Sequence, residues 1–345
     1  MNGSPKPAPP DPGDIRRAAA RLASGGVVAF PTETVYGLGA DAMDADAVAR
    51  VFALKARPAG NPLIAHVLDE AMARAVVAAW PEDASRLARA FWPGPLTLVL
   101  PKAEGVPRAV TAGGDRVAVR CPDHPVALAL LEAFGGPIVG PSANVSGAVS
   151  PTRAAHVRGV WDESDVLVLD GGPCRAGIES TVLALSEPDR PPRILRPGVI
   201  GAEAIERVLG RELEATPPAE TSAQGSPGRA GSHYCPRAPL VLVDALDELD
   251  RQLDTGPCVV LGPPGAPINV APPHRSIPMP AGAAGYAAEL YAALREADTI
   301  ADASTEARIV AVRPPDHGAT LEDTAIWAAV RERLERASAR ATGNR

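Results

Sequence analysis

The sequence is poor in lysine and in aromatic residues. Only Lys6, Lys55 and Lys102 are lysines among 34 Lys+Arg, and Phe, Trp and Tyr together make up 3% of the 345 residues. Acidic residues number 41, so the formal net charge is −7. Surfaces that grip nucleic acid usually combine excess positive charge with stacking aromatics. The composition therefore argues against a protein built mainly for that task, and it makes each retained lysine a candidate for a specific role.

Long apolar runs and paired cysteines are also missing. No run reaches the roughly 18 apolar residues that a membrane span needs, and residues 1–13 read as a disordered tail rather than a signal peptide. We therefore expect a cytoplasmic protein without a membrane partner. No CxxC or zinc-type spacing occurs, so free thiols are predicted and no protein metal site is expected. The cysteines are Cys121, Cys174, Cys235 and Cys258.

Several catalytic signatures are absent as well. The chain has no GxSxG, no HExxH and no Walker A lysine loop, and it shows no evident pair of catalytic acids. The Gly262-Pro263-Pro264-Gly265 turn is too rich in proline to copy a dinucleotide-binding GxGxxG. These absences exclude the common classes of serine hydrolase, zinc protease and P-loop nucleotide-binding protein.

What is present predicts two α/β domains. The chain is 46% hydrophobic and 22% charged, which suits packed cores. Short β-rich runs alternate with helical patterns over 14–210, predicting a twisted mixed sheet with helices. Residues 211–239 are rich in Pro, Gly and Ser and read as an interdomain tether or a lid. Residues 240–338 restart the rhythm as a smaller doubly wound, Rossmann-like unit, and 339–345 form a second tail.

A cationic cluster follows the helix expected at 46–55. Lys55 ends that helix, and Arg57 lies two residues later, held in extended geometry by Pro58. Lysine supplies a point charge and arginine a planar fork, and together they suit a phosphate or a carboxylate. The alternative is that Lys55 simply complements a helix C-terminus.

Hydroxyl and amide side chains gather at other strand-to-loop junctions. The loop after Phe30 holds two threonines and a carboxylate, and Ser142 and Asn144 follow a predicted strand. Backbone N–H groups at such junctions can cradle anions. Thr152 stands where a helix is expected to begin, so it is placed to cap that helix or to touch a ligand. The combined pattern is typical of a polyanion site, whereas each loop alone could be a simple turn.

These motifs together resemble the YrdC-like family in its long, two-domain form. They occur in the family's order and extend into the linker, while the region after 240 resembles the smaller second domain more loosely. The matching segments are FPTETVYGLGADA (30–42), KARPAGNPL (55–63), FWPGPLTLVL (91–100), VAVRCPDHP (117–125), GPSANVSGAVSPT (140–152), ESTVL (179–183), LRPG (195–198) and SPG…HYCP (226–236).

The resemblance implies an L-threonylcarbamoyladenylate synthase, a nucleotidyltransferase of tRNA modification. ATP, L-threonine and bicarbonate would give L-threonylcarbamoyladenylate and pyrophosphate, with Mg²⁺ carried by the ATP phosphates rather than by protein ligands. Partner proteins would transfer the group to tRNA to make threonylcarbamoyladenosine, so contact with tRNA itself would be weak or indirect.

The resemblance also assigns roles to individual residues. Both substrate steps bring anions together, so positioning and charge neutralisation would dominate catalysis. The implied catalytic cluster is Lys55, Arg57, Ser142 and Asn144. The implied L-threonine site is Thr34, His66, Arg120 and Ser180, with Arg120 pairing the carboxylate. The implied ATP contacts are Arg57, Asn61, Ser142, Asn144, Thr152, Arg196 and Tyr234.

The sequence departs from the family's pattern in two places, and it leaves two rival functions open. Arg229–Ser232 and Cys235 depart from the family's linker pattern, and Arg116 replaces a threonine that the family commonly has before VAVR. An isolated His66 is more often structural, and Tyr234 could be a packing anchor. The rival functions are an RNA-binding module and a carbamoyltransferase of related fold.

Overall fold

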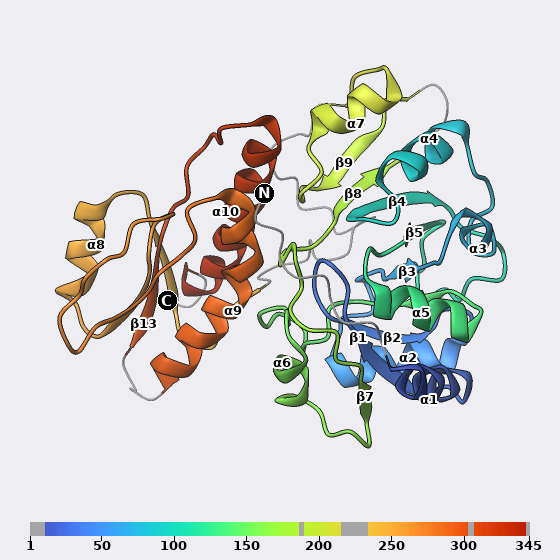
Figure 1. Ribbon diagram of the computed structural model, residues 1–345, viewed down its shortest axis with the longest axis horizontal. Coiled ribbons are helices and arrows are strands. Elements are labelled where there is room, and N and C mark those ends of the chain that lie inside the picture. The colour runs from blue at the N-terminus through green and yellow to red at the C-terminus, as the bar shows by residue number, and fades with distance from the viewer. Residues whose placement is uncertain (1–10, 186–189, 215–233, 303–306, 343–345) are drawn as a thin grey trace. The chain divides into compact units, whose positions relative to one another are not determined.

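A computed structural model describes residues 11–185, 190–214, 234–302 and 307–342. These residues form two compact units, which are described separately (Figure 1). The larger unit holds the described residues up to Ser146, together with Pro151–Arg175 and 179–214. The second unit holds those from 234 onward and two short earlier segments, Gly147–Ser150 and Ala176–Ile178. Among the described helices, none is long and apolar enough to cross a membrane.

The larger unit is built on a mixed sheet, as predicted. Over the described residues the sheet has nine strands in the order β7-β1-β2-β6-β3-β5-β4-β8-β9. Parallel pairs such as β3–β5 and β4–β8 stand beside antiparallel pairs such as β4–β5. The strands are β1 (Val27–Phe30), β2 (Gly37–Asp41), β3 (Ile64–His66), β4 (Leu96–Pro101), β5 (Arg116–Arg120), β6 (Ile138–Val139), β7 (Val166–Val168), β8 (Thr181–Ala184) and β9 (Arg193–Arg196).

Buried apolar residues on this sheet form more than one cluster. The main core includes Leu38, Leu98 and Val119. A smaller cluster uses the alternate residues Ile64, Val99, Ala118, Val182 and Leu195 from five neighbouring strands. Because side chains alternate between the two faces of a strand, this smaller cluster lies on the face opposite the main core.

Capping side chains and backbone conformation set the ends of helices in the larger unit. The helices are α1 (Pro12–Ala23), α2 (Ala45–Lys55), α3 (Glu70–Ala73), α4 (Glu82–Phe91), α5 (Pro125–Phe134), α6 (Ala154–Arg158) and α7 (Ala202–Leu209). Asp11 caps α1 through the backbone N–H of Gly13, so that helix begins inside the stretch expected to be a tail. Helix α2 starts at the Asp44 cap and ends at Ala56, whose φ of 47° is left-handed. That termination leaves Lys55 as the last helical residue.

The predicted start of a helix at Thr152 is wrong. Helix α6 begins at Ala154, with Arg153 as its N-cap residue. The Pro151 carbonyl accepts a hydrogen bond from the Tyr36 N–H (2.8 Å) and the Thr152 N–H donates to His156 Nδ1 (3.2 Å). These contacts engage the backbone of both residues before the helix starts, so Thr152 does not cap it.

The second unit is the small doubly wound domain that the sequence predicts. Its described strands, all parallel, are β10 (Leu240–Val243), β11 (Cys258–Leu261), β12 (Arg275–Ile277) and β13 (Arg308–Val312), in the order β10-β13-β11-β12. Figure 1 shows α8 on one side of this sheet and α9 and α10 on the other. These helices are α8 (Leu246–Leu253), α9 (Ala283–Asp302) and α10 (Leu321–Thr342). Most of the predicted linker or lid, 211–239, lies outside the described residues. All four cysteines are buried free thiols, as predicted.

Candidate active site

Lys55 anchors the first part of the candidate site. Its side chain is 1% exposed, and Nζ donates to the carbonyl oxygens of Ser142 and Asn144, each at 2.5 Å. Burial, and then repulsion from Arg57, holds the pKa of Lys55 well below its usual value. The structure thus brings together Lys55, Ser142 and Asn144, three residues of the predicted catalytic cluster. The reading of Lys55 as a plain helix-end charge is wrong, because the ammonium group turns into the protein.

Arg57 follows Lys55 in the turn after α2. Its Nε donates to the Asn61 carbonyl (3.1 Å) and its Nη2 to the Pro62 carbonyl (2.8 Å), which fixes the turn between α2 and β3. Beside that turn lies a hollow of about 690 Å³. Its lining includes Gly60, Pro62 and Arg116, with Val99 and Ala118 of the smaller apolar cluster. A volume of this size suits a small ligand.

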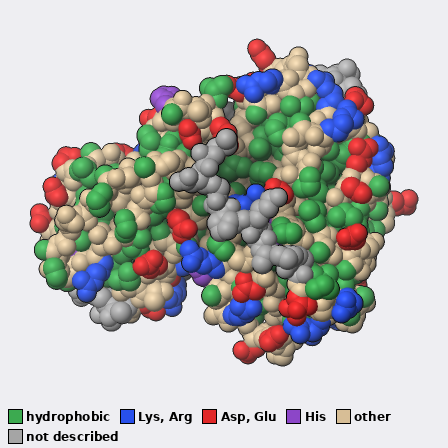
Figure 2. All heavy atoms as spheres, viewed as in Figure 1, with side chains coloured by type: hydrophobic (Ala, Val, Ile, Leu, Met, Phe, Trp, Pro, Cys, Tyr) green, Lys and Arg blue, Asp and Glu red, His purple; other side chains and the backbone are tan. Residues whose placement is uncertain are grey.

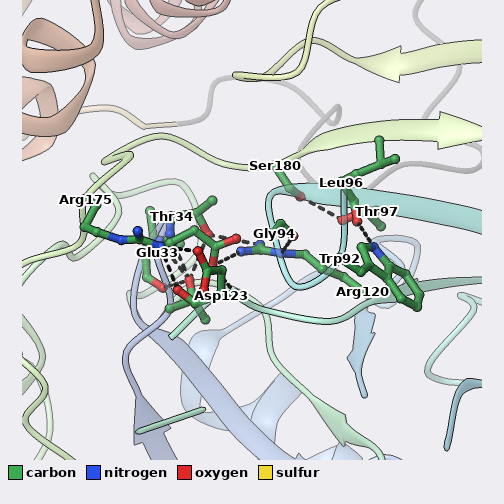
Figure 3. Close-up of polar contacts among 12 residues, drawn as sticks. Glu33, Thr34, Trp92, Gly94, Leu96, Thr97, Arg120, Asp123, Arg175 and Ser180 are labelled. Carbon is green, nitrogen blue, oxygen red and sulfur yellow. Dashed lines mark hydrogen bonds and ion pairs between the residues drawn. The ribbon is translucent and has the colours of Figure 1, made fainter. Parts of the chain in front are cut away.

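Arg120 is the centre of a second, charge-paired cluster. Its Nη2 lies 2.6 Å from Glu33 Oε2, and both side chains are almost fully buried. Its Nη1 donates to Thr34 Oγ1 (3.0 Å) and its Nε to the Gly94 carbonyl (3.2 Å). Figure 3 shows these contacts running from Arg120 to the Glu33–Thr34 loop. The guanidinium is therefore held in one orientation, with two of its five N–H groups left over for a ligand.

His66 lies on the strand next to Arg120. The two residues are register partners in the parallel β3–β5 pair, and the His66 ring packs edge-on against Phe30 at 5.4 Å. Burial, followed by the Arg120 charge, lowers the pKa of His66 to about 3. Its buried Nδ1 has no hydrogen-bond partner among the described residues. A neutral ring with an unsatisfied nitrogen is suited to accept or donate one hydrogen bond to a polar ligand.

Ser180 and Arg196 join the same end of the sheet. Ser180 immediately precedes β8, and its Oγ lies 2.8 Å from Thr97 Oγ1 of β4. Arg196 Nη2 donates to both the hydroxyl and the carbonyl of Ser180, at 3.1 and 3.0 Å. Because β3, β5, β4, β8 and β9 are neighbours, their residues His66, Arg120, Thr97, Ser180 and Arg196 share one end of the sheet.

Thr152 and Tyr234 stand apart from these contacts. Thr152 is buried in the larger unit, and its Oγ1 has no hydrogen-bond partner among the described residues. Tyr234 belongs to the second unit, where its ring stacks on Tyr291 with centroids 5.5 Å apart. Its expected contact with ATP stays a prediction.

Sequence reasoning missed several polar partners. Glu33 was noted only as one carboxylate in a loop, yet it pairs with Arg120 and accepts from the Asp123 N–H (3.1 Å). Thr97 lies between two leucines in β4, and its hydroxyl contacts that of Ser180. A single polar residue inside the LTLVL run was the available signal for Thr97. No local pattern marks a partner 87 residues away in the chain, which is the separation of Glu33 and Arg120.

The surface charge agrees with the composition. On the face seen in Figure 2, Lys and Arg side chains are interspersed with Asp and Glu, and they form no continuous basic field. Exposed pairs such as Arg175–Asp123 (2.6 Å) account for part of this mixing. That face is unlike the basic tracts that grip RNA backbones.

Comparison with known proteins places the chain in a family. The Sua5/YciO/YrdC profile, described as "Telomere recombination", matches residues 20–198, and a profile described as "Threonylcarbamoyl-AMP synthase, C-terminal domain" matches 200–339. Threonylcarbamoyl-AMP synthase of Pyrococcus abyssi is 47% identical over 244 residues, covering 70% of this chain and 71% of the relative. The Bacillus subtilis enzyme of the same name is 46% identical over 241 residues, covering 69% of each.

A solved structure extends this match to the whole fold. The crystal structure of P. abyssi Sua5 complexed with L-threonine gives a TM-score of 0.80 at 38% identity, covering 94% of each chain. The match includes both units, and it confirms the resemblance drawn from the eight sequence segments. One profile spans more than half of this chain, and the chain covers more than two thirds of two relatives that are nearly 50% identical to it. The chain therefore belongs to the Sua5/YciO/YrdC family.

Proposed function

We propose that this protein is a threonylcarbamoyl-AMP synthase, which joins ATP, L-threonine and bicarbonate and releases pyrophosphate. The observation that carries the proposal is the buried Lys55 ammonium, placed beside Arg57 and bound to the carbonyls of Ser142 and Asn144. A buried cation whose pKa is depressed gains most from a neighbouring polyanion. The relatives' names and the L-threonine in the P. abyssi structure supply the two substrates.

The reaction runs in two steps. The threonine amine attacks the bicarbonate carbon, and loss of the elements of water leaves a carbamate. A carbamate oxygen then attacks the α-phosphorus of ATP, and the bond to the β-phosphate oxygen breaks to release pyrophosphate. Negative charge accumulates in both steps, so fixed cations stabilise the transition state more than the separate substrates.

Lys55, Arg57, Ser142 and Asn144 hold bicarbonate and the phosphates in this proposal. The loop from Arg57 to Asn61 is fixed by its own hydrogen bonds, so the cation is preorganised. Asn61, Thr152, Arg196 and Tyr234 complete the ATP contacts. Mg²⁺ enters with the phosphates, since this donor set is cationic and amidic and suits no divalent ion of its own.

Thr34, His66, Arg120 and Ser180 hold L-threonine. Arg120 offers its two remaining N–H groups to the carboxylate, while Glu33 keeps the guanidinium in place. The neutral His66 ring and the Ser180 hydroxyl offer hydrogen bonds to the amine or the hydroxyl of threonine. The product would pass to proteins that transfer the threonylcarbamoyl group to tRNA.

A product assay tests the function. Pyrophosphate release should require threonine and bicarbonate together, and mass spectrometry should identify L-threonylcarbamoyladenylate. Equal release with serine or without an amino acid would count against threonine as the substrate. Turnover with carbamoyl phosphate would favour a carbamoyltransferase, and tight, salt-steep RNA binding without turnover would favour an RNA-binding module.

A further inference from the structure

Helix α9 of the second unit contacts two segments from the range that the sequence assigns to the larger domain, 14–210, and one residue of the predicted linker. These segments are Gly147–Ser150, Ala176–Ile178 and the residue Tyr234, and all belong to the second unit. The contacting positions on α9 are Ala287 with its neighbour Ala288, then Tyr291 and Arg295. Residues four apart lie on one face of a helix. One stripe of α9 therefore holds all three segments.

Arg295 holds the first segment through its backbone. Its Nε donates to the Ser150 carbonyl at 3.3 Å and its Nη2 to the Val149 carbonyl. Both of those residues are nearly fully buried, and burial lowers the pKa of Arg295 to about 10, so the fork remains charged at neutral pH. A planar fork offers its N–H groups to two successive carbonyls in a fixed geometry, whereas a lysine ammonium is a compact point charge on a flexible stem. The Cys235 N–H donates to the Gly147 carbonyl (2.8 Å), so the segment is fixed at both ends.

The other two segments pack against the same stripe. Gly177 has a φ of +69°, and a Cβ there would lie 2.3 Å from the Ala287 carbonyl oxygen. Only glycine allows that approach. The Tyr234 ring stacks on Tyr291, and the Arg333 guanidinium lies 5.9 Å from the centroid of the Tyr234 ring. Close backbone packing and stacking leave these segments little freedom relative to α9.

The held segments lead directly into the candidate site. Asn144 lies three residues before Gly147, and Thr152 lies two residues after Ser150. Ser180 lies two residues after Ile178. We propose that α9 is a positioning scaffold for the active site, and that Arg295 is the positioning residue that fixes the Asn144–Thr152 loop by binding the Val149 and Ser150 carbonyls. This inference rests on the proposed function for its catalytic meaning, and it gives the second unit a defined task.

Three variants test the proposal. Arg295→Met removes the charge and the fork while keeping an unbranched apolar stem, and Arg295→Lys keeps the charge without the fork. The matched control is Arg308→Met, because Arg308 also donates to a loop carbonyl of the second unit, that of Thr255 (3.2 Å). Hydrogen exchange of the amides over 147–152 is measured in the full-length, ligand-free protein. Steady-state pyrophosphate release is measured with ATP and threonine varied in turn.

Arg295→Met should speed exchange over 147–152 by about tenfold or more, because two buried carbonyls lose a charged donor. The KM for ATP should rise about tenfold while the KM for threonine stays within about twofold, since the loop leads to Thr152 and Asn144. Arg295→Lys should fall between Arg295→Met and wild type in both readouts, and Arg308→Met should match wild type.

Unchanged exchange in Arg295→Met would overturn the proposal, as would an equal rise of both KM values or the same effect in Arg308→Met. If Arg295→Met does not fold, wild-type exchange in Arg295→Lys would overturn it equally. Absence of pyrophosphate release in the wild-type protein would refute the proposed function instead, while the exchange data would still show whether Arg295 fixes the loop.

Discussion

The two polar clusters of the larger unit handle buried positive charge in opposite ways. Arg120 faces a carboxylate, Glu33, at 2.6 Å. The contacts described for the Lys55 ammonium are two carbonyl oxygens, and the influences on its pKa are burial and the charge of Arg57, both of which lower it. A neutralised arginine is suited to orient a ligand, whereas an uncompensated cation gains from an anion that arrives with the substrate. In the proposed function, the Arg120 cluster would therefore recognise the substrate and the Lys55 cluster would stabilise charge.

Removing the cations of the Lys55 cluster should have the largest effect. Lys55→Met and Arg57→Ala should each lower kcat/KM by roughly 10²–10³, the usual cost of removing a preorganised group that stabilises transition-state charge. Pyrophosphate release measures this. Lys102→Met is the control, because Lys102 is a lysine of the same unit outside the cluster. A near-normal rate in Lys55→Met would remove that residue from the chemistry.

Breaking the Arg120 pair should affect stability and recognition together. Glu33→Gln leaves a buried guanidinium without its counter-charge, so the free energy of unfolding should fall by about 3 kcal/mol, within the range for breaking a buried pair. The KM for threonine should also rise. Asp123→Asn is the matched control, since it removes an exposed pair with Arg175 that is worth less than about 1 kcal/mol. Equal losses in the two variants would erase the distinction between the buried and the exposed pair.

Proton uptake on ATP binding should distinguish the two clusters. The pKa of Lys55 is depressed in the free protein, and bound phosphates favour the charged form, so ATP binding raises that pKa. Between the free and bound pKa values, binding should therefore take up protons. Calorimetry in buffers of different ionisation enthalpy measures the uptake, and Lys55→Met should abolish it. Uptake that persists in Lys55→Met would assign the proton to another group.

The smallest expected effect concerns His66. Its folded-state pKa is about 3 and its ordinary value is 6.5, so between these limits the unfolded state binds more protons. The contribution of His66 to stability is therefore lost as the pH falls from 6.5 toward 3. Denaturant unfolding at stepped pH should show a shallower acid loss in His66→Gln than in wild type. His317→Gln, with an exposed ring in the second unit, is the control. An unchanged pH slope in His66→Gln would place the acid sensitivity elsewhere.

Local sequence predicted the elements of the site better than their partners. The helix ending at Lys55 and the strand that precedes Ser142 follow from local patterns of apolar residues. The predicted start of helix α6 was wrong because a residue distant in the chain intervenes: the Tyr36 N–H donates a hydrogen bond to the Pro151 carbonyl. Long-range hydrogen bonds of this kind leave no periodic signal.

Short-range patterns along the chain were enough to predict the two-domain α/β organisation, the order of the family's motifs and the candidate residues. Tertiary structure decided that Lys55 turns inward, that Glu33 neutralises Arg120, and that Gly147–Ser150 and Ala176–Ile178 belong to the second unit. These features depend on burial and on contacts between distant segments, and the free energy of a buried charge is set by the neighbours that folding brings to it.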